Sequence, residues 1–410
     1  MRAKILSLLV VLLLLLSTFS TAFAQPEPFC GDLDEADCAL IQNAEAAMMD
    51  LTSYRSLATY NATVAGLPGL PVDEIVVDLE ADAVFSLDES ALEAMQELAM
   101  VESQEDVAML MEESPEVFVA FYDGVNFDMS LSAMGNAEVV DLLSQQSGLD
   151  VPESLSIGLI MVDGVLYADL TELKPLIPEL AGVEGWIGIE LVKLIAAAVE
   201  QGVFAQAAQQ MSPEAMTENM EMSGIDPASV GALLGVQAAL ANPEAFEQFL
   251  SIARVDDAEI NGEQAAVFVT SFDIAAFISS PEFVDMVKML AASGALGDDA
   301  PTEADIEQGL QMVGLMGPML FQGLKAQNTL AVGLDSNYVL ATGSLFSWDL
   351  GSLLQMAAMS GALPADMMPT GAAAIIEFST EVTNSDFDAD LTIEEPAGAQ
   401  VIPAEIMMSN

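Results

Sequence analysis

Carboxylates are the side chains in this sequence that could do chemistry. The 410-residue chain holds 64 Asp and Glu, two Cys and no His. The lack of histidine excludes Ser–His and Cys–His nucleophiles and histidine-ligated metal sites. Paired carboxylates can still act as acid and base in a hydrolase. With 64 candidates, however, the sequence singles out no pair. A carboxylate hydrolase is therefore ranked third, behind the two hypotheses given at the end of this section.

Three aspartates recur in one local pattern. An aromatic residue precedes the Asp by one or two places and an aliphatic residue follows it in "YADLTELKPL", "SFDIAAFISS" and "SWDLGSLLQM". We interpret Asp169, Asp273 and Asp349 as caps at corners where a strand passes into a helix, because such an Asp accepts first-turn N–H groups and favours the positive end of the helix dipole. The alternative is a triplet of acidic ligands for one metal. Capping explains the pattern without a ligand, so no catalytic, cofactor-binding or metal-binding residue is predicted, and no enzyme.

The first 24 residues have the features of a secretory signal peptide. Arg2 and Lys4 precede the apolar run 5–16, and "AFA" ends at Ala24. This order of charge, apolar run and small residues predicts cleavage after Ala24. The alternative is an uncleaved anchor, but the run is shorter than the ~20 residues of a membrane span. We therefore expect a protein secreted or held in the cell envelope.

Two cysteines stand close together at the start of the predicted mature chain. Cys30 and Cys38 are eight positions apart in "CGDLDEADC". An oxidising compartment favours a disulfide between them over two free thiols, and a loop this small should stabilise the fold by about 2–3 kcal/mol. The spacing is not that of a redox or zinc motif. The preceding "PEPF" is no lipobox, which argues against a lipid on Cys30.

The charge balance limits the partners. Two of the eight bases, Arg2 and Lys4, lie in the signal, which leaves 64 acids against six bases. Such a surface repels nucleic acid and anionic membrane headgroups. The chain is nevertheless 53% hydrophobic, so it can bury a large core in one big domain or two. The acids are the solvated surface of an apolar body, suited to a secreted protein and to saline water.

Period-two alternation is clear in several segments, and it predicts a sheet with one apolar and one wet face, which is typical of antiparallel pairing. The Asp-Gly and Asn-Gly pairs in "YDGV", "VDGV" and "NGEQ" predict hairpins at 122–125, 162–165 and 261–264. The predicted strands are 52–64, 74–87, 116–123, 125–133, 154–162, 165–170, 254–260, 264–272, 329–334, 337–346, 372–383 and 386–394. The predicted helices are 34–50, 89–112, 136–146, 190–210, 228–251, 275–293, 303–326 and 351–360.

The predicted helix 303–326 is apolar nearly all round, and its charges stand at its ends. A helix of this kind is buried or faces something apolar, and Pro318 should kink it. Its surplus apolar surface either packs against other helices or lines a cavity that flexible Met side chains can reshape. The candidate cavity-lining residues are Met312, Leu315, Met316, Met319 and Leu320.

Three segments together resemble the LolA/LppX-type lipoprotein-carrier superfamily: "IMVDGVLYADL", "GVEGWIGIEL" and "FSTEVTNSDFDADLTIEEPAGAQVIP". The resemblance implies an α+β fold, a strongly curved antiparallel sheet forming a half-barrel, with helices packed on its concave face over an apolar cavity. It implies no catalytic residue. The chain departs from the group in its greater length and missing lipobox. We expect a signal peptide at 1–24, a disulfide-clipped segment and helix at 25–50, the half-barrel domain with helical insertions at 51–396, and a tail at 397–410.

The resemblance and the apolar helices make a secreted carrier or binder of acyl chains or lipids the first hypothesis. Its partner would be a hydrophobic small molecule, and it would need no cofactor. A structural or adhesive surface protein with a solid core is the alternative. A carrier needs an open apolar cavity, whereas a hydrolase needs two carboxylates facing across a cleft.

Overall fold

A computed structural model of the protein describes residues 29–67, 72–99, 109–111, 113–147, 151–174, 185–203, 246–284, 323–359 and 374–408, together with 177, 182 and 321. The predicted signal peptide, 1–24, lies outside these residues, as does most of the predicted helices 228–251 and 303–326.

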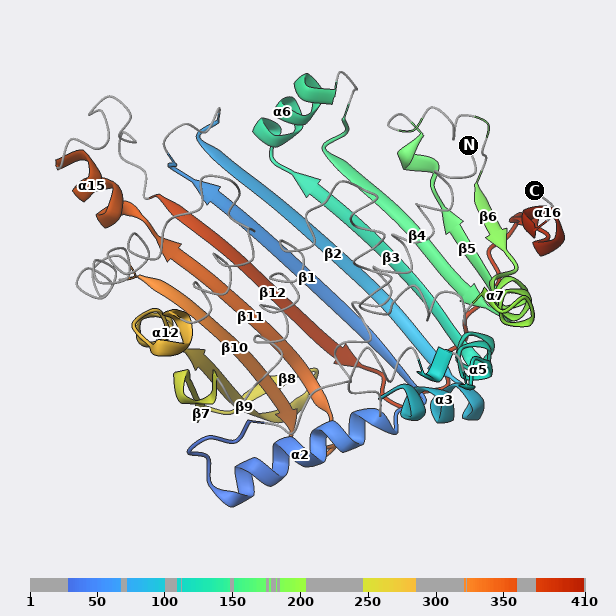
Figure 1. The fold of residues 1–410 in the computed structure, drawn as a ribbon, viewed down its shortest axis with the longest axis horizontal. Coiled ribbons are helices and arrows are strands. Elements are labelled where there is room, and N and C mark those ends of the chain that lie inside the picture. Colours follow the sequence, from blue (N-terminus) through green and yellow to red (C-terminus); the bar gives the residue numbers. More distant parts are fainter. Residues whose placement is uncertain are drawn as a thin grey trace.

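Over the described residues, the architecture is α+β and is built on a 13-stranded sheet (Figure 1). Its strands are β1 (Ser53–Ala65), β2 (Glu74–Leu87), β3 (Val125–Gly135), β4 (Ser154–Val162), β5 (Val165–Asp169), β6 (Trp186–Ile189), β7 (Leu250–Arg254), β8 (Ala258–Ile260), β9 (Glu263–Phe272), β10 (Leu324–Gly333), β11 (Val339–Asp349), β12 (Ile375–Ser385) and β13 (Gln400–Ile402). They follow the order β13-β6-β5-β4-β3-β2-β1-β12-β11-β10-β9-β7, with β8 paired to β9. All pairs are antiparallel except β13 with β6. The sheet is curved and open, as predicted.

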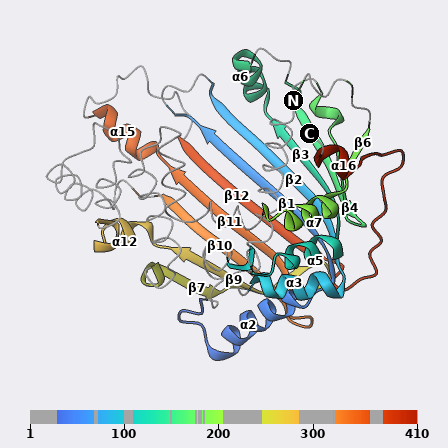
Figure 2. The same cartoon turned by 45° about the vertical axis from the view of Figure 1, so that its right-hand side comes forward.

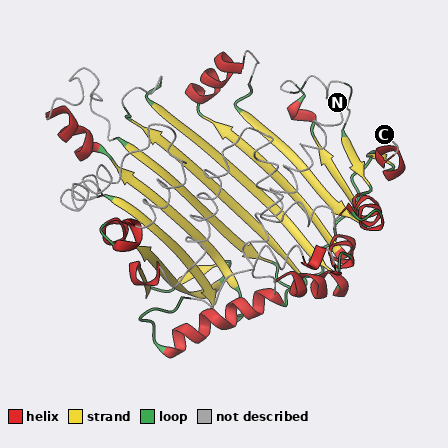
Figure 3. Cartoon of the chain, in the orientation of Figure 1, coloured by secondary structure: helices red, strands yellow, loops and turns green. Residues whose placement is uncertain are grey.

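Helices gather at the two ends of the strands, as the colouring by secondary structure shows (Figure 3). None of the helices in the described ranges is long and apolar enough to cross a membrane. The helices are α2 (Glu35–Met49), α3 (Glu89–Ala99), α5 (Glu116–Gly124), α6 (Ala137–Ser147), α7 (Leu191–Glu200), α12 (Ile274–Ile278), α15 (Gly351–Met359) and α16 (Ala404–Met408), with 3₁₀ turns η1 (Thr171–Leu173) and η3 (Glu247–Phe249).

Strand register divides the side chains between two faces. Residues directly opposite one another on neighbouring strands point to the same side of a sheet. Tyr60 is opposite Leu79 on β2 and Thr380 on β12, while Asn61 is opposite Asp78 and Ser379. One face, which we call the concave face, carries mainly apolar side chains: Leu166, Leu159, Met129, Ala83, Ala58, Val382, Phe378, Phe346, Leu330 and Phe268. The opposite, convex face carries Asp128, Asp82, Arg55, Glu381 and Glu377.

Helices cover the concave face near one end of the strands. Leu191 of α7 and Phe121 of α5 pack on a cluster that includes Met129 and Leu159. Farther along the sheet, Ile41 of α2 packs on β9 and β10. In the turned view, α3, α5 and α7 lie in front of the lower ends of the strands (Figure 2). The predicted arrangement, helices on the concave face of a half-barrel, is confirmed.

Two of the three predicted hairpins form. Asp163 and Gly164 have φ of 50° and 73°, and Asn261 and Gly262 have φ of 53° and 86°. Positive φ at both central residues defines the type I′ turn, whose twist matches the flanking strands. These turns join β4 to β5 and β8 to β9.

The predicted strand 116–123 and its hairpin at 122–125 are wrong, because the segment is the helix α5. Val117 and Phe121 are four residues apart, which places them on one side of a helix, and Phe121 contacts the core. Gly124 does not form a turn. It lets the chain pass close to Asp88, because an added Cβ would collide with the Asp88 carboxylate. Tertiary packing therefore overrides the β propensity of this stretch.

The predicted strand 386–394 is also wrong: the segment is irregular, and the next strand is β13. Asp386 and Asp388 have φ of 54° and 50°, which breaks an extended course. Phe387 stacks on Tyr338 with ring centroids 4.5 Å apart. The alternating segment 386–394 cannot pair with β12, the strand that precedes it, because β12 already pairs on both sides, with β1 and β11.

Boundaries also differ elsewhere, and three of the differences concern β7, β8 and β10. Residues 324–326 begin β10 and do not continue the predicted helix 303–326. Leu250 begins β7 instead of lying in the predicted helix 228–251. The predicted strand 254–260 is divided between the end of β7 and β8. These boundaries are set by the pairing of β9 with β7, β8 and β10.

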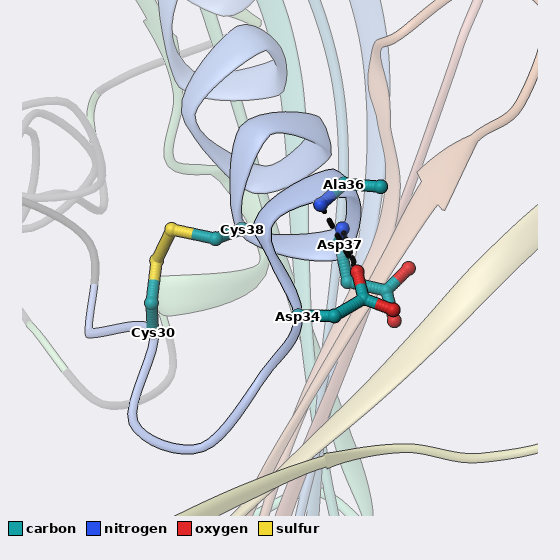
Figure 4. The surroundings of a disulfide bond; sticks show 5 residues. All are labelled: Cys30, Asp34, Ala36, Asp37 and Cys38. Carbon is teal, nitrogen blue, oxygen red and sulfur yellow. Dashed lines mark hydrogen bonds between the residues drawn. A yellow bond between two sulfur atoms is a disulfide. The ribbon is translucent and has the colours of Figure 1, made fainter.

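The predicted disulfide is present, since Cys30 and Cys38 are bonded with their Cα atoms 5.4 Å apart (Figure 4). Between them, the Asp34 carboxylate accepts the backbone N–H groups of Ala36 and Asp37 at 3.0 and 2.9 Å. The cap and the disulfide thus fix the first turn of α2, whose Ile41 and Ala44 are buried against the sheet.

Candidate functional site

The described helices leave the central part of the concave face uncovered. Phe378 on β12 and Leu79 on β2 belong to this face and are 48% and 45% exposed. Large apolar side chains in the middle of a sheet are normally buried, and an exposed apolar patch of this kind marks a binding surface. The candidate site is therefore the uncovered part of the concave face.

A hollow of about 240 Å³ lies on this face over β7 and β9 to β12. Phe378 and Phe346, directly opposite each other on β12 and β11, form one side with ring centroids 6.2 Å apart. The lining residues are Leu250, Thr270, Phe272, Ala326, Gln327, Asn328, Ser344, Leu345, Phe346, Phe378 and Thr380.

An aromatic cluster supports the β7–β9 end of the hollow. The Phe272 ring lies 6.2 Å from Phe249 and 5.5 Å from Phe277 between centroids. Asp273 caps α12 directly after Phe272, so the chain turns at this point and carries Phe277 back against the ring. Tilted and edge-on aromatic contacts of this kind hold the wall of the hollow in one arrangement.

The two faces of the sheet differ in charge. Among the described residues that line the hollow, none has an ionisable side chain. The convex face carries the Arg55–Asp82 ion pair at 2.7 Å and the Asn61–Asp78 hydrogen bond at 2.5 Å. Burial, and then the nearby Asp82 carboxylate, raise the pKa of Asp128 on that face. The described strands therefore present apolar and neutral polar groups to the site, and their acids point to the convex face.

The three recurring aspartates cap the structures that follow them, as predicted. The Asp169 carboxylate accepts the N–H of Thr171 at 3.0 Å, before η1. Asp273 accepts the N–H of Ala276 at 2.8 Å, and Asp349 that of Gly351 at 2.8 Å. Across the described ranges, no three Cys, Asp or Glu side chains are grouped so as to hold a metal ion.

The predicted cavity-lining residues, Met312, Leu315, Met316, Met319 and Leu320, lie outside the described residues, and their role stays a prediction. The hollow is formed by strands, whereas the sequence pattern indicated apolar helices as its walls. The strand sequence does contain a feature that points to the hollow. Thr380 stands between Phe378 and Val382, where strict alternation would place another apolar residue.

No protein-family model matches the chain. No curated protein matches it either. Among solved structures, the Mycobacterium tuberculosis lipoprotein LppX aligns with 88% of this chain and 100% of its own, at 9% identity and a TM-score of 0.25. A DUF1329 family protein from Desulfovibrio piger aligns with 87% of this chain and 94% of its own, at 7% identity and a TM-score of 0.17.

Proposed function

We propose that this protein is a secreted or envelope protein that binds a hydrophobic ligand, an acyl chain or lipid, on the concave face of its sheet. We also propose that residues 1–24 direct its export, and that the half-barrel over 51–396 is the ligand-binding unit. Neither catalysis nor a cofactor is part of this proposal.

The exposure of Phe378 beside the hollow is the observation that carries the proposal. Apolar surface left in water costs about 25 cal/mol for each Å². A protein with 64 acids has ample polar residues for its surface, yet it places Phe378 and Phe346 side by side on an uncharged face. Binding an apolar ligand there removes the unfavourable hydration of both rings.

The size and charge of the site indicate what kind of ligand fits. Ligand sites for small molecules typically measure about 300–1,000 Å³, so a hollow of about 240 Å³ takes a segment of an acyl chain rather than a whole lipid. The remaining length would lie along the exposed part of the concave face toward Leu79. Because no base is found among the described residues that line the hollow, selectivity comes from shape and apolar contact.

Filling the hollow provides the test. Ala326 on β10 lines it, so Ala326→Trp should occupy the space that a chain would take. Leu57 on β1 is 40% exposed and points to the convex face, opposite Asp82. Leu57→Trp is therefore the matched control. Binding of an acyl chain carrying a neutral fluorophore is titrated against the delipidated wild type and both variants, after circular dichroism has verified their folding.

We expect saturable binding by the wild type and by Leu57→Trp, and binding at least about tenfold weaker by Ala326→Trp, the loss that corresponds to roughly 1.4 kcal/mol. A folded, delipidated wild type that binds no chain would reject the proposal and favour a structural or adhesive role. Equal binding by all three proteins would place the ligand elsewhere.

A further inference from the structure

A row of neutral polar side chains crosses the mainly apolar concave face. Thr380 on β12 is opposite Ser344 on β11, Ser344 is opposite Asn328 on β10, and Asn328 is opposite Thr270 on β9. Tyr60 on β1 is opposite Thr380 and extends the row by one strand. We call these five residues the neutral polar row. With neighbouring strands ~4.8 Å apart, it runs about 19 Å across the sheet.

The row stands between mainly apolar side chains on both sides, with Thr342 on β11 as a polar exception. On one side, Phe378 and Phe346 lie two residues from Thr380 and Ser344 along their strands and are opposite each other. On the other side, Leu330 and Phe268 lie two residues from Asn328 and Thr270 along their strands and are also opposite each other. Four members of the row, all except Tyr60, line the hollow. The polar groups therefore lie within the proposed ligand site rather than at its edge.

The hydrogen-bonding groups of the row are available. Within the ranges that the structure describes, no side-chain hydrogen bond is made by Thr270, Asn328, Ser344 or Thr380, and Ser344 and Asn328 are exposed. By contrast, the convex-face neighbour of Asn328, Gln327, donates to the Ser271 hydroxyl at 3.2 Å. Hydroxyl and amide groups can both donate and accept hydrogen bonds. The row can therefore pair with a ligand oxygen that accepts a hydrogen bond and with a ligand hydroxyl that donates one.

We propose that the neutral polar row recognises an uncharged oxygen-bearing group of the ligand, an ester or a hydroxyl, that lies between apolar segments. This inference rests on the proposed function and specifies its ligand as a neutral lipid rather than a fatty-acid anion or a plain hydrocarbon. The site offers hydrogen bonds without charge, and an ester flanked by acyl chains matches the sequence of apolar, polar and apolar rows. Neither of the alternatives does so: a hydrocarbon leaves the row unpaired beneath it, and a carboxylate meets no base among the described residues that line the hollow.

Hydrogen bonds between the row and the ligand also explain why the polar row does not weaken binding. A polar group covered by an apolar ligand without a partner is unfavourable, whereas the same group paired with ligand oxygen is stabilising. The row therefore discriminates in both directions, against hydrocarbon by desolvation and in favour of esters by hydrogen bonding. Discrimination based on an unpaired buried group is stronger than that based on apolar contact alone.

The test compares two ligands that share a 16-carbon chain, monopalmitoylglycerol and hexadecane, both delivered from cyclodextrin, by displacement of the fluorescent acyl probe. The variant Asn328→Leu/Ser344→Ala/Thr380→Val removes the polar groups at nearly constant volume. The control, Ser379→Ala/Thr383→Val, makes similar changes on β12 at two positions that point to the convex face. Palmitate is measured alongside at high salt, to limit general repulsion by the acidic surface.

The wild type and the control should bind monopalmitoylglycerol about tenfold or more tightly than hexadecane or palmitate, and the triple variant should lose that preference while retaining hexadecane. If the wild type binds the glyceride and hexadecane equally, the proposed function stands and the role of the row is rejected. The role of the row is rejected too if the triple variant keeps the preference. If no ligand binds, the proposed function itself fails.

Discussion

Asp388 and Thr52 are 336 positions apart in sequence and are joined by two hydrogen bonds. One carboxylate oxygen of Asp388 accepts the backbone N–H of Thr52 at 3.0 Å and its hydroxyl at 2.9 Å. The other oxygen accepts the hydroxyl of Tyr338 at 3.0 Å. The segment after β12 is thereby tied to the start of β1, in the middle of the sheet and beside the strands that form the hollow.

Replacing Asp388 should weaken the protein in a pH-dependent way. The Thr52 bonds, foremost the one from its backbone N–H, lower the pKa of Asp388. A carboxyl whose pKa is lowered by folding stabilises the protein above its ordinary pKa, and this contribution is lost as pH falls through the folded value. We expect Asp388→Asn to lose about 1 kcal/mol at pH 7 and nothing near pH 2.

Urea unfolding at both pH values checks this. Asp386→Asn is the control, because Asp386 is exposed, shares the positive φ and makes no bond to Thr52. An equal loss in the two variants, or a loss by Asp388→Asn that persists in strong acid, would contradict the role given to the Thr52 bonds.

Gly158 should tolerate no side chain. On the convex face, the Trp186 ring of β6 covers it, and an added Cβ would lie 2.5 Å from the ring. Overpacking of this kind costs about 1–3 kcal/mol, so Gly158→Ala should lower the melting temperature. Ser156→Ala, two residues earlier on the same strand and face, is exposed and should change it little. If the two variants melt together, Trp186 does not pack on Gly158 as described.

The disulfide should stabilise the N-terminal helix without being needed for the sheet. Cys30→Ser/Cys38→Ser should lower the free energy of unfolding by about 2–3 kcal/mol, the value for a short closed loop. Ile41 and Ala44 remain to hold α2 on β9 and β10, so the circular dichroism of the variant at low temperature should equal that of the wild type. A variant that unfolds at low temperature would show that the disulfide is required for folding itself.

The acidic surface should make stability depend on salt and pH. Burial, then repulsion from Asp82, raise the pKa of Asp128. A carboxyl whose pKa is raised by folding favours the folded state at low pH, and that benefit is lost as pH rises through the folded value. Asp128→Asn should therefore raise the melting temperature at pH 7, and less so in 1 M salt, where charges are screened within about 3 Å. A wild type whose melting temperature does not rise with salt would contradict this prediction.

The elements that could be predicted from sequence are those whose local signals agree with their surroundings. The strand 74–87 matches β2 at both ends, because its apolar side chains alternate over a long run. Asp273 was predictable as a cap, since a capping bond joins residues only three apart. The strand predicted at 116–123 failed because Val117 and Phe121 fit a helix as well, and only contact with β3 and β4 selects it.

The hollow could not be predicted for a different reason. Thr270, Asn328, Ser344 and Thr380 come from four strands, and only the register between those strands places them in one row. A shift of one residue in any pairing would turn that strand's member to the convex face. Register depends on pairing between separate segments: Thr270 and Asn328 are 58 positions apart, and Ser344 and Thr380 are 36 positions apart. No local pattern encodes pairing at such separations.

The most direct test of ligand binding on the concave face is to locate a bound chain by photo-crosslinking. A fatty acyl ester with a diazirine in its chain is irradiated with the delipidated protein, and labelled residues are identified by mass spectrometry, with and without excess unlabelled ester. We predict labels on Phe378, Phe346 and Phe272, removed by the competitor and absent from Leu57 on the convex face. Label that spreads over both faces, or that the competitor does not remove, would contradict the assignment of the concave face as the binding site.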